Sequence, residues 1–163
     1  MTEVLDRLTA DDPSAGSAVV PGLYDRLIGS WSIESEWFSR DGSSATASGT
    51  WDFVRILGGL GVQDVLGVDG APPSKLGTTL RCLDASIGAW RVTWAQPAAG
   101  EFASLLGRAE GDDIVQESAP GWDGPAVRWS FREITGSSFL WLGEVQDDDG
   151  TWFLEQRMAA TRI

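Results

Sequence analysis

Five polar side chains lie on strand faces that also carry apolar residues, and they are the first candidates for chemistry. The alternation places Arg55, Asp64, Gln116, Glu133 and Gln156 on these faces, if each strand keeps its register. A charge inside an apolar interior is costly unless it is paired or bound to a ligand. Arg55 with Asp64 or Glu133 could therefore orient a polar head group, and either carboxylate could transfer a proton. The alternative is that a bulge or a position at the mouth puts these side chains in water.

Nine tryptophans make an aromatic interior the second candidate feature. An indole ring stacks on flat or polycyclic molecules, and its N–H can donate a hydrogen bond. The rings could either fill a core or line a cavity, and so much indole is hard to pack without leaving a space. The aromatic residues that we expect around such a cavity are Trp37, Trp51, Phe53, Trp90, Trp94, Trp129 and Trp141.

The composition excludes several classes of function. The chain has no histidine, which removes the commonest general base near neutral pH and the commonest ligand of zinc and haem iron. A net charge of −12 repels phosphate backbones and anionic lipids, so we expect neither nucleic acid nor membrane as a partner. The acidic run 147–149 lacks the distal glutamate of a calcium loop and sits where a hairpin turn is required. We therefore expect no metal and no cofactor.

The candidate residues must be positioned by strands. Period-two alternation runs from Trp31 onward, with turn residues about every 8 to 12 positions. Tight turns favour up-and-down pairing, and a sheet of that many twisted strands tends to curl shut. The sequence predicts an all-β fold, a single closed antiparallel barrel of about ten strands with a short helix within 21–28. The expected strands cover 31–37, a segment through 51–55, 62–68, 78–85, 90–94, 102–108, 114–118, 127–134, 139–145 and 152–160.

One domain accounts for the length of 163 residues. Residues 1–20 are interpreted as a flexible N-terminal segment, and 21–163 as the barrel domain. The single cysteine, Cys82, cannot form an internal disulfide, and its parity with Leu80 predicts a buried, inert thiol. Without a secretory signal or a long apolar run, a cytoplasmic location is expected. The oligomeric state is left open, a homodimer included.

Gly29-Ser30-Trp31 at the start of the first strand, with Arg157 or Arg162 on the last, resembles the lipocalin and fatty-acid-binding (calycin) barrels. In that superfamily, a Gly-x-Trp tryptophan packs beside an arginine from the far end of the chain. The chain is also similar, over about 22–162, to an uncharacterised bacterial calycin-like family. The segments that carry this similarity are Gly49-Thr50-Trp51, 56–65, Gly77-Thr78-Thr79-Leu80-Arg81, Trp90-Arg91-Val92-Thr93-Trp94 and Gly150-Thr151-Trp152.

The resemblance implies a ten-stranded barrel, related to the fatty-acid-binding and nitrobindin types, with a ligand cavity and no particular reaction. Nitrobindin-like members hold haem through a histidine, which this chain lacks, so haem binding is not carried over. Some bacterial calycin-like proteins are cofactor-free cyclases of natural-product pathways, but no residue pattern ties this chain to them.

The sequence predicts binding of a small apolar molecule, aromatic or polyketide-like, inside the barrel. Arg55 and the glutamines would fix the orientation of this molecule. One alternative is a cofactor-free cyclase, isomerase or lyase that uses Asp64 or Glu133. The other is a structural or protein-interaction barrel with a filled interior.

Overall fold

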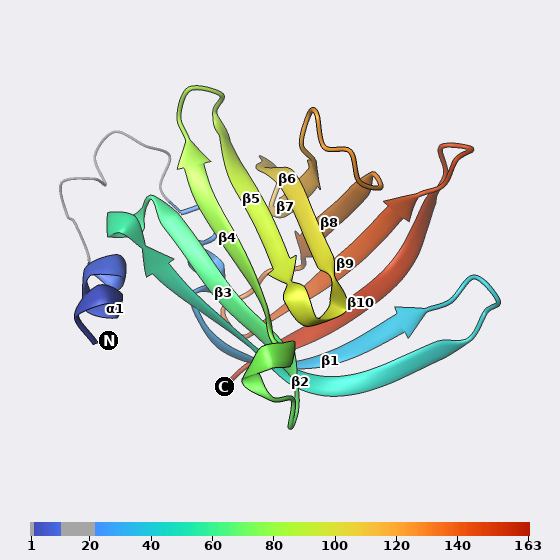
Figure 1. The fold of residues 1–163 in the computed structure, drawn as a ribbon, viewed down its shortest axis with the longest axis horizontal. Coiled ribbons are helices and arrows are strands. Elements are labelled where there is room, and N and C mark those ends of the chain that lie inside the picture. The colour runs from blue at the N-terminus through green and yellow to red at the C-terminus, as the bar shows by residue number, and fades with distance from the viewer. Residues whose placement is uncertain (1, 11–21) are drawn as a thin grey trace.

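Within residues 2–10 and 22–163, which the computed structural model describes, ten antiparallel strands close into one barrel (Figure 1). Each strand pairs with its neighbours in the sequence, and β1 pairs with β10 to close the ring. The predicted all-β fold, a closed up-and-down barrel, is confirmed, and the short N-terminal helix lies at Thr2–Thr9 instead of within 21–28. The strands are β1 (Gly29–Phe38), β2 (Ser44–Ile56), β3 (Gly61–Val68), β4 (Gly77–Asp84), β5 (Ala89–Gln96), β6 (Glu101–Glu110), β7 (Asp113–Ser118), β8 (Val127–Arg132), β9 (Ser138–Gln146) and β10 (Trp152–Arg162).

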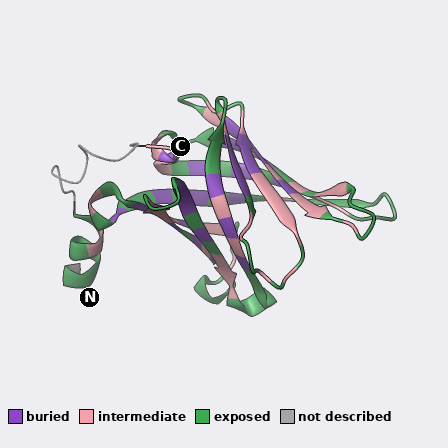
Figure 2. Cartoon of the chain, turned by 90° about the horizontal axis from the view of Figure 1, so that it is seen from above, coloured by how far each residue is buried: buried purple, intermediate pink, exposed green. Residues whose placement is uncertain are grey.

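Alternation along the strands decides which side chains enter the barrel. In β1, Trp31, Ile33 and Ser35 are buried, whereas Ser32 and Glu34 are exposed. Partners in register point to the same face of a sheet, so the pairing of Trp31 with Trp51 of β2 turns both indoles inward. Figure 2 shows the resulting alternation of buried and exposed positions along the strands.

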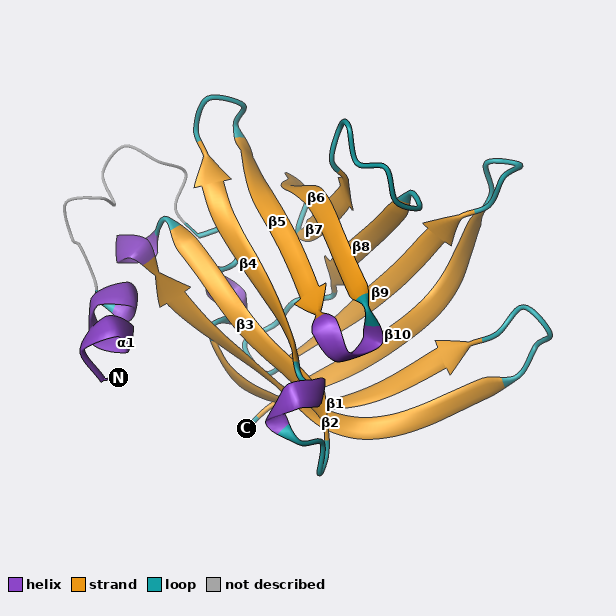
Figure 3. Cartoon of the chain, viewed as in Figure 1, coloured by secondary structure: helices purple, strands orange, loops and turns teal. Residues whose placement is uncertain are grey.

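The helical segments are short, and helix α1 (Thr2–Thr9), drawn at the left of Figure 3, lies outside the barrel wall. This helix lies beside β2 and the 3-10 turn η3 (Leu57–Gly59). The helix predicted within 21–28 is reduced to one 3-10 turn, η2 (Asp25–Leu27), since Leu27 N–H bonds Tyr24 O. Two further 3-10 turns are η4 (Pro73–Lys75) and η5 (Pro97–Ala99). Within the flexible segment expected over 1–20, Thr2–Thr9 forms helix α1, and residues 11–20 lie outside the described residues.

No helix in the described part of the chain is long and apolar enough to cross a bilayer.

One end of the barrel is closed by the segment 22–28 and the end of β10. Trp31 is fully buried and donates its Nε1–H to Leu27 O at 2.7 Å. The Arg162 guanidinium lies 4.0 Å from the Trp31 ring centroid, so the tryptophan–arginine packing expected from the calycin resemblance is present, with Arg162 as the partner. Arg162 also donates to the carbonyl oxygens of Arg26, Ile28 and Gly136. These contacts tie the closing segment to both β10 and the β8–β9 turn.

The half of the interior next to this closed end is filled with side chains. Tyr24, fully buried, meets Trp90 edge-on at 5.2 Å and Phe131 at 6.3 Å between ring centroids. Phe53 and Phe139 pack against the same group of rings. Among the described residues, packed rings therefore fill this half of the interior.

Strand β4 turns a different face inward from the one its sequence favours. Thr79 and Arg81 are buried, whereas Leu80 is 41 % exposed and Cys82 is partly exposed. The register explains this orientation, because Thr79 pairs with the inward residue Asp64 of β3. The expected full burial of Cys82 is therefore wrong. Its partial burial still raises the pKa of the thiol.

Candidate functional site

A cavity of about 670 Å³ occupies the half of the barrel away from the closed end. This volume lies within the range of ordinary small-molecule sites. Its opening, the mouth, is bordered by the turns 39–43, 69–76, 97–100, 119–126 and 147–151. The residues around the cavity are Ile33, Ser35, Trp37, Phe38, Trp51, Leu66, Gly67, Val68, Thr79, Arg81, Trp94, Gln96, Gly100, Glu101, Phe102, Ala103, Pro125, Val127, Trp129, Trp141, Gly143, Glu155, Gln156 and Met158.

Four indoles form a continuous aromatic wall along the cavity. Trp94 of β5 meets Trp129 of β8 edge-on at 6.3 Å, and Trp129 lies 5.8 Å from Trp141 of β9. Trp141 in turn meets Trp51 of β2 at 6.2 Å. The planes of Trp94 and Trp129 are perpendicular, so the wall presents ring faces and ring edges to the same space.

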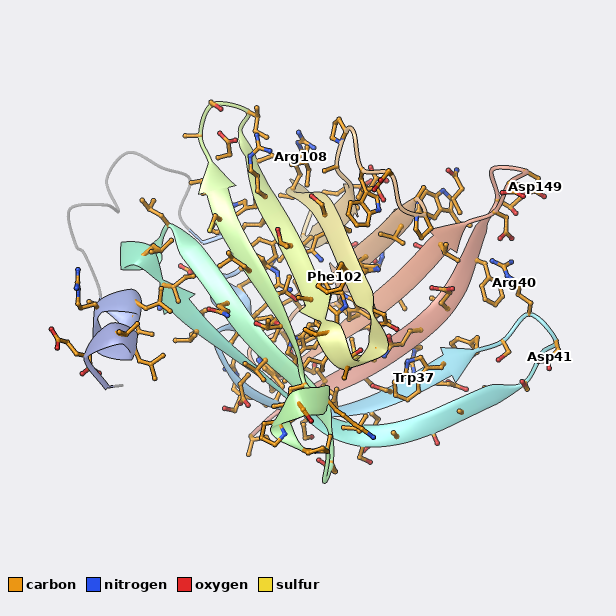
Figure 4. All side chains as sticks on the ribbon, viewed as in Figure 1. Trp37, Arg40, Asp41, Phe102, Arg108 and Asp149 are labelled. Carbon is orange, nitrogen blue, oxygen red and sulfur yellow. The ribbon has the colours of Figure 1, made fainter. Side chains whose placement is uncertain are left out.

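Two aromatic residues stand closer to the mouth, at the ends of their strands. Trp37 of β1 is partly exposed, and Phe102 of β6 is 57 % exposed. Figure 4 labels both side chains, with Arg40 and Asp149 on the turns beside the mouth. Trp37 has the inward parity of β1, so an apolar ligand entering the barrel would meet its ring before the four-indole wall.

Glycines make room for two of the wall tryptophans. A Cβ atom at Gly77 would overlap the Trp94 ring, and one at Gly143 would overlap the Trp141 ring. Each ring packs directly against the Cα of its glycine, where any larger residue would place a Cβ atom. The shape of the cavity therefore depends on these two glycines as well as on the indoles.

The floor of the cavity contains a buried ion pair. Arg81 Nη1 donates to Asp64 Oδ2 at 2.6 Å, and both side chains are at most 1 % exposed. Asp64 Oδ1 accepts the backbone N–H of Thr79 at 2.8 Å, so both carboxylate oxygens have partners. Arg81 and Thr79 line the cavity, whereas Asp64 lies behind them. The ion pair offers the cavity a guanidinium whose charge is already balanced.

Gln116 connects this ion pair to the filled half. Its Oε1 accepts Arg81 Nε–H at 3.2 Å and the Tyr24 hydroxyl at 3.0 Å. Burial raises the pKa of Tyr24 far above its ordinary value, which keeps the hydroxyl protonated as a donor. Arg81 also lies 5.1 to 5.7 Å from the ring centroids of Tyr24, Phe53 and Phe131. Arg81 thus separates the filled half from the cavity.

Two buried side-chain nitrogens have no hydrogen-bond partner within the described residues, Trp51 Nε1 and Gln116 Nε2. Unpaired buried donors are uncommon, because losing water without gaining a partner costs about 1–3 kcal/mol. Trp51 belongs to the cavity wall, so one of these donors lies on a residue that a ligand would touch.

The rim of the cavity carries amides and carboxylates. Gln96 and Glu101 border it at the β5–β6 turn, and Glu155 and Gln156 border it from β10. A register shift in β10 between Leu154 and Gln156 places Glu155 in a β-bulge. The bulge brings two consecutive side chains to the rim, which strict alternation would not do.

The structure brings six of the predicted site residues together around the cavity. They are Trp37, Trp51, Trp94, Trp129, Trp141 and Gln156. Three other predicted residues point inward but lie outside the cavity lining: Phe53 and Trp90 belong to the filled half, and Gln116 lies behind the floor. Asp64 is inside as expected, with Arg81 as its partner in place of Arg55 or Glu133.

The expected inward positions of Arg55 and Glu133 are wrong. Arg55 lies near the end of β2 at the closed end, where its Nε bonds Asp25 at 3.0 Å and its side chain is 43 % exposed. Glu133 is exposed, because β8 ends at Arg132 and Glu133 adopts a left-handed conformation with φ of 51°. The predicted strand 127–134 was too long by two residues, and alternation does not apply beyond its end.

Sequence reasoning missed Arg81, Thr79 and Tyr24 as interior residues. A buried Asp64 requires a cationic partner, and this requirement was the one signal in the sequence that could have indicated an inward-facing arginine such as Arg81. The apolar character of Leu80 pointed to the wrong face of β4, which hid Arg81 and Thr79. Tyr24 was visible only as part of a predicted helix, and nothing in the sequence relates it to Gln116.

No protein-family model matches the chain, and a search of curated proteins finds no match. Among solved structures, the chain is similar to an S-type phycobiliprotein lyase from Guillardia theta. The TM-score is 0.59 at 10 % identity, over 85 % of this chain and 89 % of that one. A redesigned β-barrel matches with a TM-score of 0.45 at 12 % identity, over 90 % of this chain and 99 % of that one. The likeness to the lyase shows a shared barrel fold.

Proposed function

We propose that the protein binds a small, largely apolar molecule, aromatic or polyketide-like, in the cavity of about 670 Å³. The observation that carries this proposal is the division of the interior. One half is packed with rings, and the other is open and walled by four indoles. A barrel with a purely structural role has no need for such a space, because filling it would add stability.

Apolar burial supplies most of the binding free energy. A flat ligand that buries about 300 Å² of apolar surface gains about 7 kcal/mol. Association costs at least about 4 kcal/mol in lost translational and rotational freedom. Apolar contact alone therefore gives weak binding, and useful affinity needs a few polar contacts as well.

The polar contacts at the deep end of the cavity come from Arg81, Thr79 and Trp51. They would orient the ligand, which is the role that the sequence suggested for Arg55. Arg81 uses Nε and Nη1 for Gln116 and Asp64, and its charge is balanced by Asp64. A neutral acceptor on the ligand, such as a carbonyl or hydroxyl oxygen, suits such a floor. The unpartnered Trp51 Nε1–H is a further donor for the same kind of group.

The enzymatic alternative has less support from the site. The neighbour from Guillardia theta is a lyase, which keeps a lyase reaction on this scaffold open to testing. The two carboxylates expected to move a proton are poorly placed for that task. Asp64 is fully occupied behind the floor, and Glu133 is exposed on the β8–β9 turn.

Quenching of tryptophan emission by energy transfer to pyrenebutanol tests the proposal. Ala103 faces the cavity from β6, and its neighbour Ser104 faces outward. Ala103→Phe should weaken binding at least about tenfold by filling the space, whereas Ser104→Phe should leave affinity unchanged. Circular dichroism of both variants checks that they keep the fold. Unchanged emission with the wild type, or equal binding by both variants, would contradict a ligand cavity.

A further inference from the structure

The charges around the cavity are unevenly distributed. Within the described residues, the charged side chains of its lining are Arg81, Glu101 and Glu155. Arg81 is neutralised by Asp64 at 2.6 Å. Glu101 and Glu155 are exposed rim residues. An anionic ligand group would therefore meet carboxylates at the rim and no unbalanced cation on the floor.

The turns around the mouth strengthen this asymmetry. Arg40 is the cation close to Glu155, and its Nη1 already pairs with Asp147 at 2.7 Å. The other cation in these turns is Lys75. The same turns carry more negative than positive side chains, since their carboxylates are Asp41, Asp69, Asp123, Asp147, Asp148 and Asp149. A cleft edged by one sign of charge and walled by apolar side chains focuses the potential, here a negative one.

The aromatic wall suits the same sign of ligand charge. The faces of indole rings carry negative electrostatic potential, which attracts organic cations, and tryptophan does this best among the aromatic residues. Trp129 and Trp141, 5.8 Å apart, border the same cavity as Glu155, and Trp94 borders it with Glu101. Rings and carboxylates thus border one cavity, and both favour a ligand that carries positive charge.

We propose that the ligand carries a positive charge, as a protonated or quaternary amine at the end that faces the mouth, on a flat apolar body. This assignment rests on the proposed binding function and specifies its ligand class. The apolar body occupies the indole-walled space, and the ammonium group lies at the mouth, in the negative potential of the rim that carries Glu101 and Glu155. The cavity discriminates against carboxylates and sulfonates of the same shape.

Three probes with one aromatic body separate charge from shape: pyrenebutyltrimethylammonium, pyrenebutanol and pyrenebutyrate. Their dissociation constants are measured by quenching of tryptophan emission at low ionic strength. The cation should bind at least about tenfold more tightly than the anion, with the alcohol between them. The ratio should shrink as salt is added, since the rim is solvent-exposed.

The rim variant Glu101→Gln/Glu155→Gln should reduce the preference for the cation over the anion at least about threefold, and should change the affinity for pyrenebutanol less than the affinity for the cation. Asp112→Asn, in the β6–β7 turn at the closed end, is the matched control and should keep the preference. Equal affinity for the three probes, tighter binding of pyrenebutyrate, or a rim variant that keeps the preference would overturn the charge assignment and leave the binding function standing. Binding of none of the probes would refute the binding function itself.

Discussion

Replacing Arg81 with methionine should destabilise the barrel severely, although the ion pair it removes adds little net stability. At the 2.6 Å separation of Nη1 and Oδ2, an effective dielectric constant of about 20 gives about 6 kcal/mol of Coulomb attraction. Desolvation of two buried ions costs several kcal/mol each and offsets most of that gain. Arg81→Met removes the attraction and leaves the Asp64 charge buried, so we expect a loss of about 3–5 kcal/mol.

A double-mutant cycle isolates this effect. Asp64→Asn keeps an oxygen for the Thr79 N–H, so it mainly removes the counter-charge of Arg81. Combining it with Arg81→Met removes both charges, and the double variant should be more stable than the sum of the single losses implies. We expect a coupling energy of at least about 2 kcal/mol.

Urea unfolding followed by tryptophan emission measures the free energies. Arg91→Met is the matched control, because Arg91 pairs with Asp84 on the exposed face and is itself 63 % exposed in its side chain. It should hardly move the urea midpoint. The reasoning fails if Arg81→Met is as mild as this control, or if the coupling energy is near zero.

Three further predictions concern the cavity wall and the closed end. Gly77→Ala should push Trp94 from its place, lowering the free energy of unfolding by about 1–3 kcal/mol and weakening pyrenebutanol binding; an unchanged affinity would contradict the close packing. Arg162→Ala removes three hydrogen bonds and the contact with Trp31, and should cost about 2 kcal/mol in urea unfolding. Burial raises the pKa of Tyr24, so the folded state keeps a proton that the unfolded state loses near the ordinary value of 10.0. The free energy of unfolding should therefore fall as pH rises above about 10, and Tyr24→Phe should flatten that slope.

Alternation made the strands and their inward faces predictable in most of the chain. It is a local property, so Trp51, Trp94, Trp129 and Trp141 could be assigned to the interior from their own strands. The Gly-x-Trp motif also pointed correctly to an arginine on the last strand, which is Arg162.

Depth along the barrel axis could not be predicted in this way. Parity states that Trp90 and Trp94 face inward, but not that Trp90 meets Tyr24 in the filled half while Trp94 reaches the cavity. That difference depends on where the segment 22–28 folds back into the barrel. Such a contact joins residues far apart in the sequence, so the alternation of apolar and polar residues along a strand does not reveal it.

The partner of Asp64 was unpredictable for a related reason. Arg81 faces Asp64 only because β3 and β4 pair with Thr79 opposite Asp64, a register that the sequence of neither strand determines alone. Local hydrophobicity favoured turning Leu80 inward. The buried ion pair and its hydrogen bonds to Gln116 and Thr79 favour the opposite orientation.

The most direct test of the account is the position of a bound aromatic ligand. Crystals soaked with a brominated pyrenebutanol would locate the ligand through the anomalous signal of bromine. The account predicts a bromine peak inside the barrel, among Trp94, Trp129 and Trp141. A peak confined to the outer surface, or side chains filling the space between these rings, would contradict it.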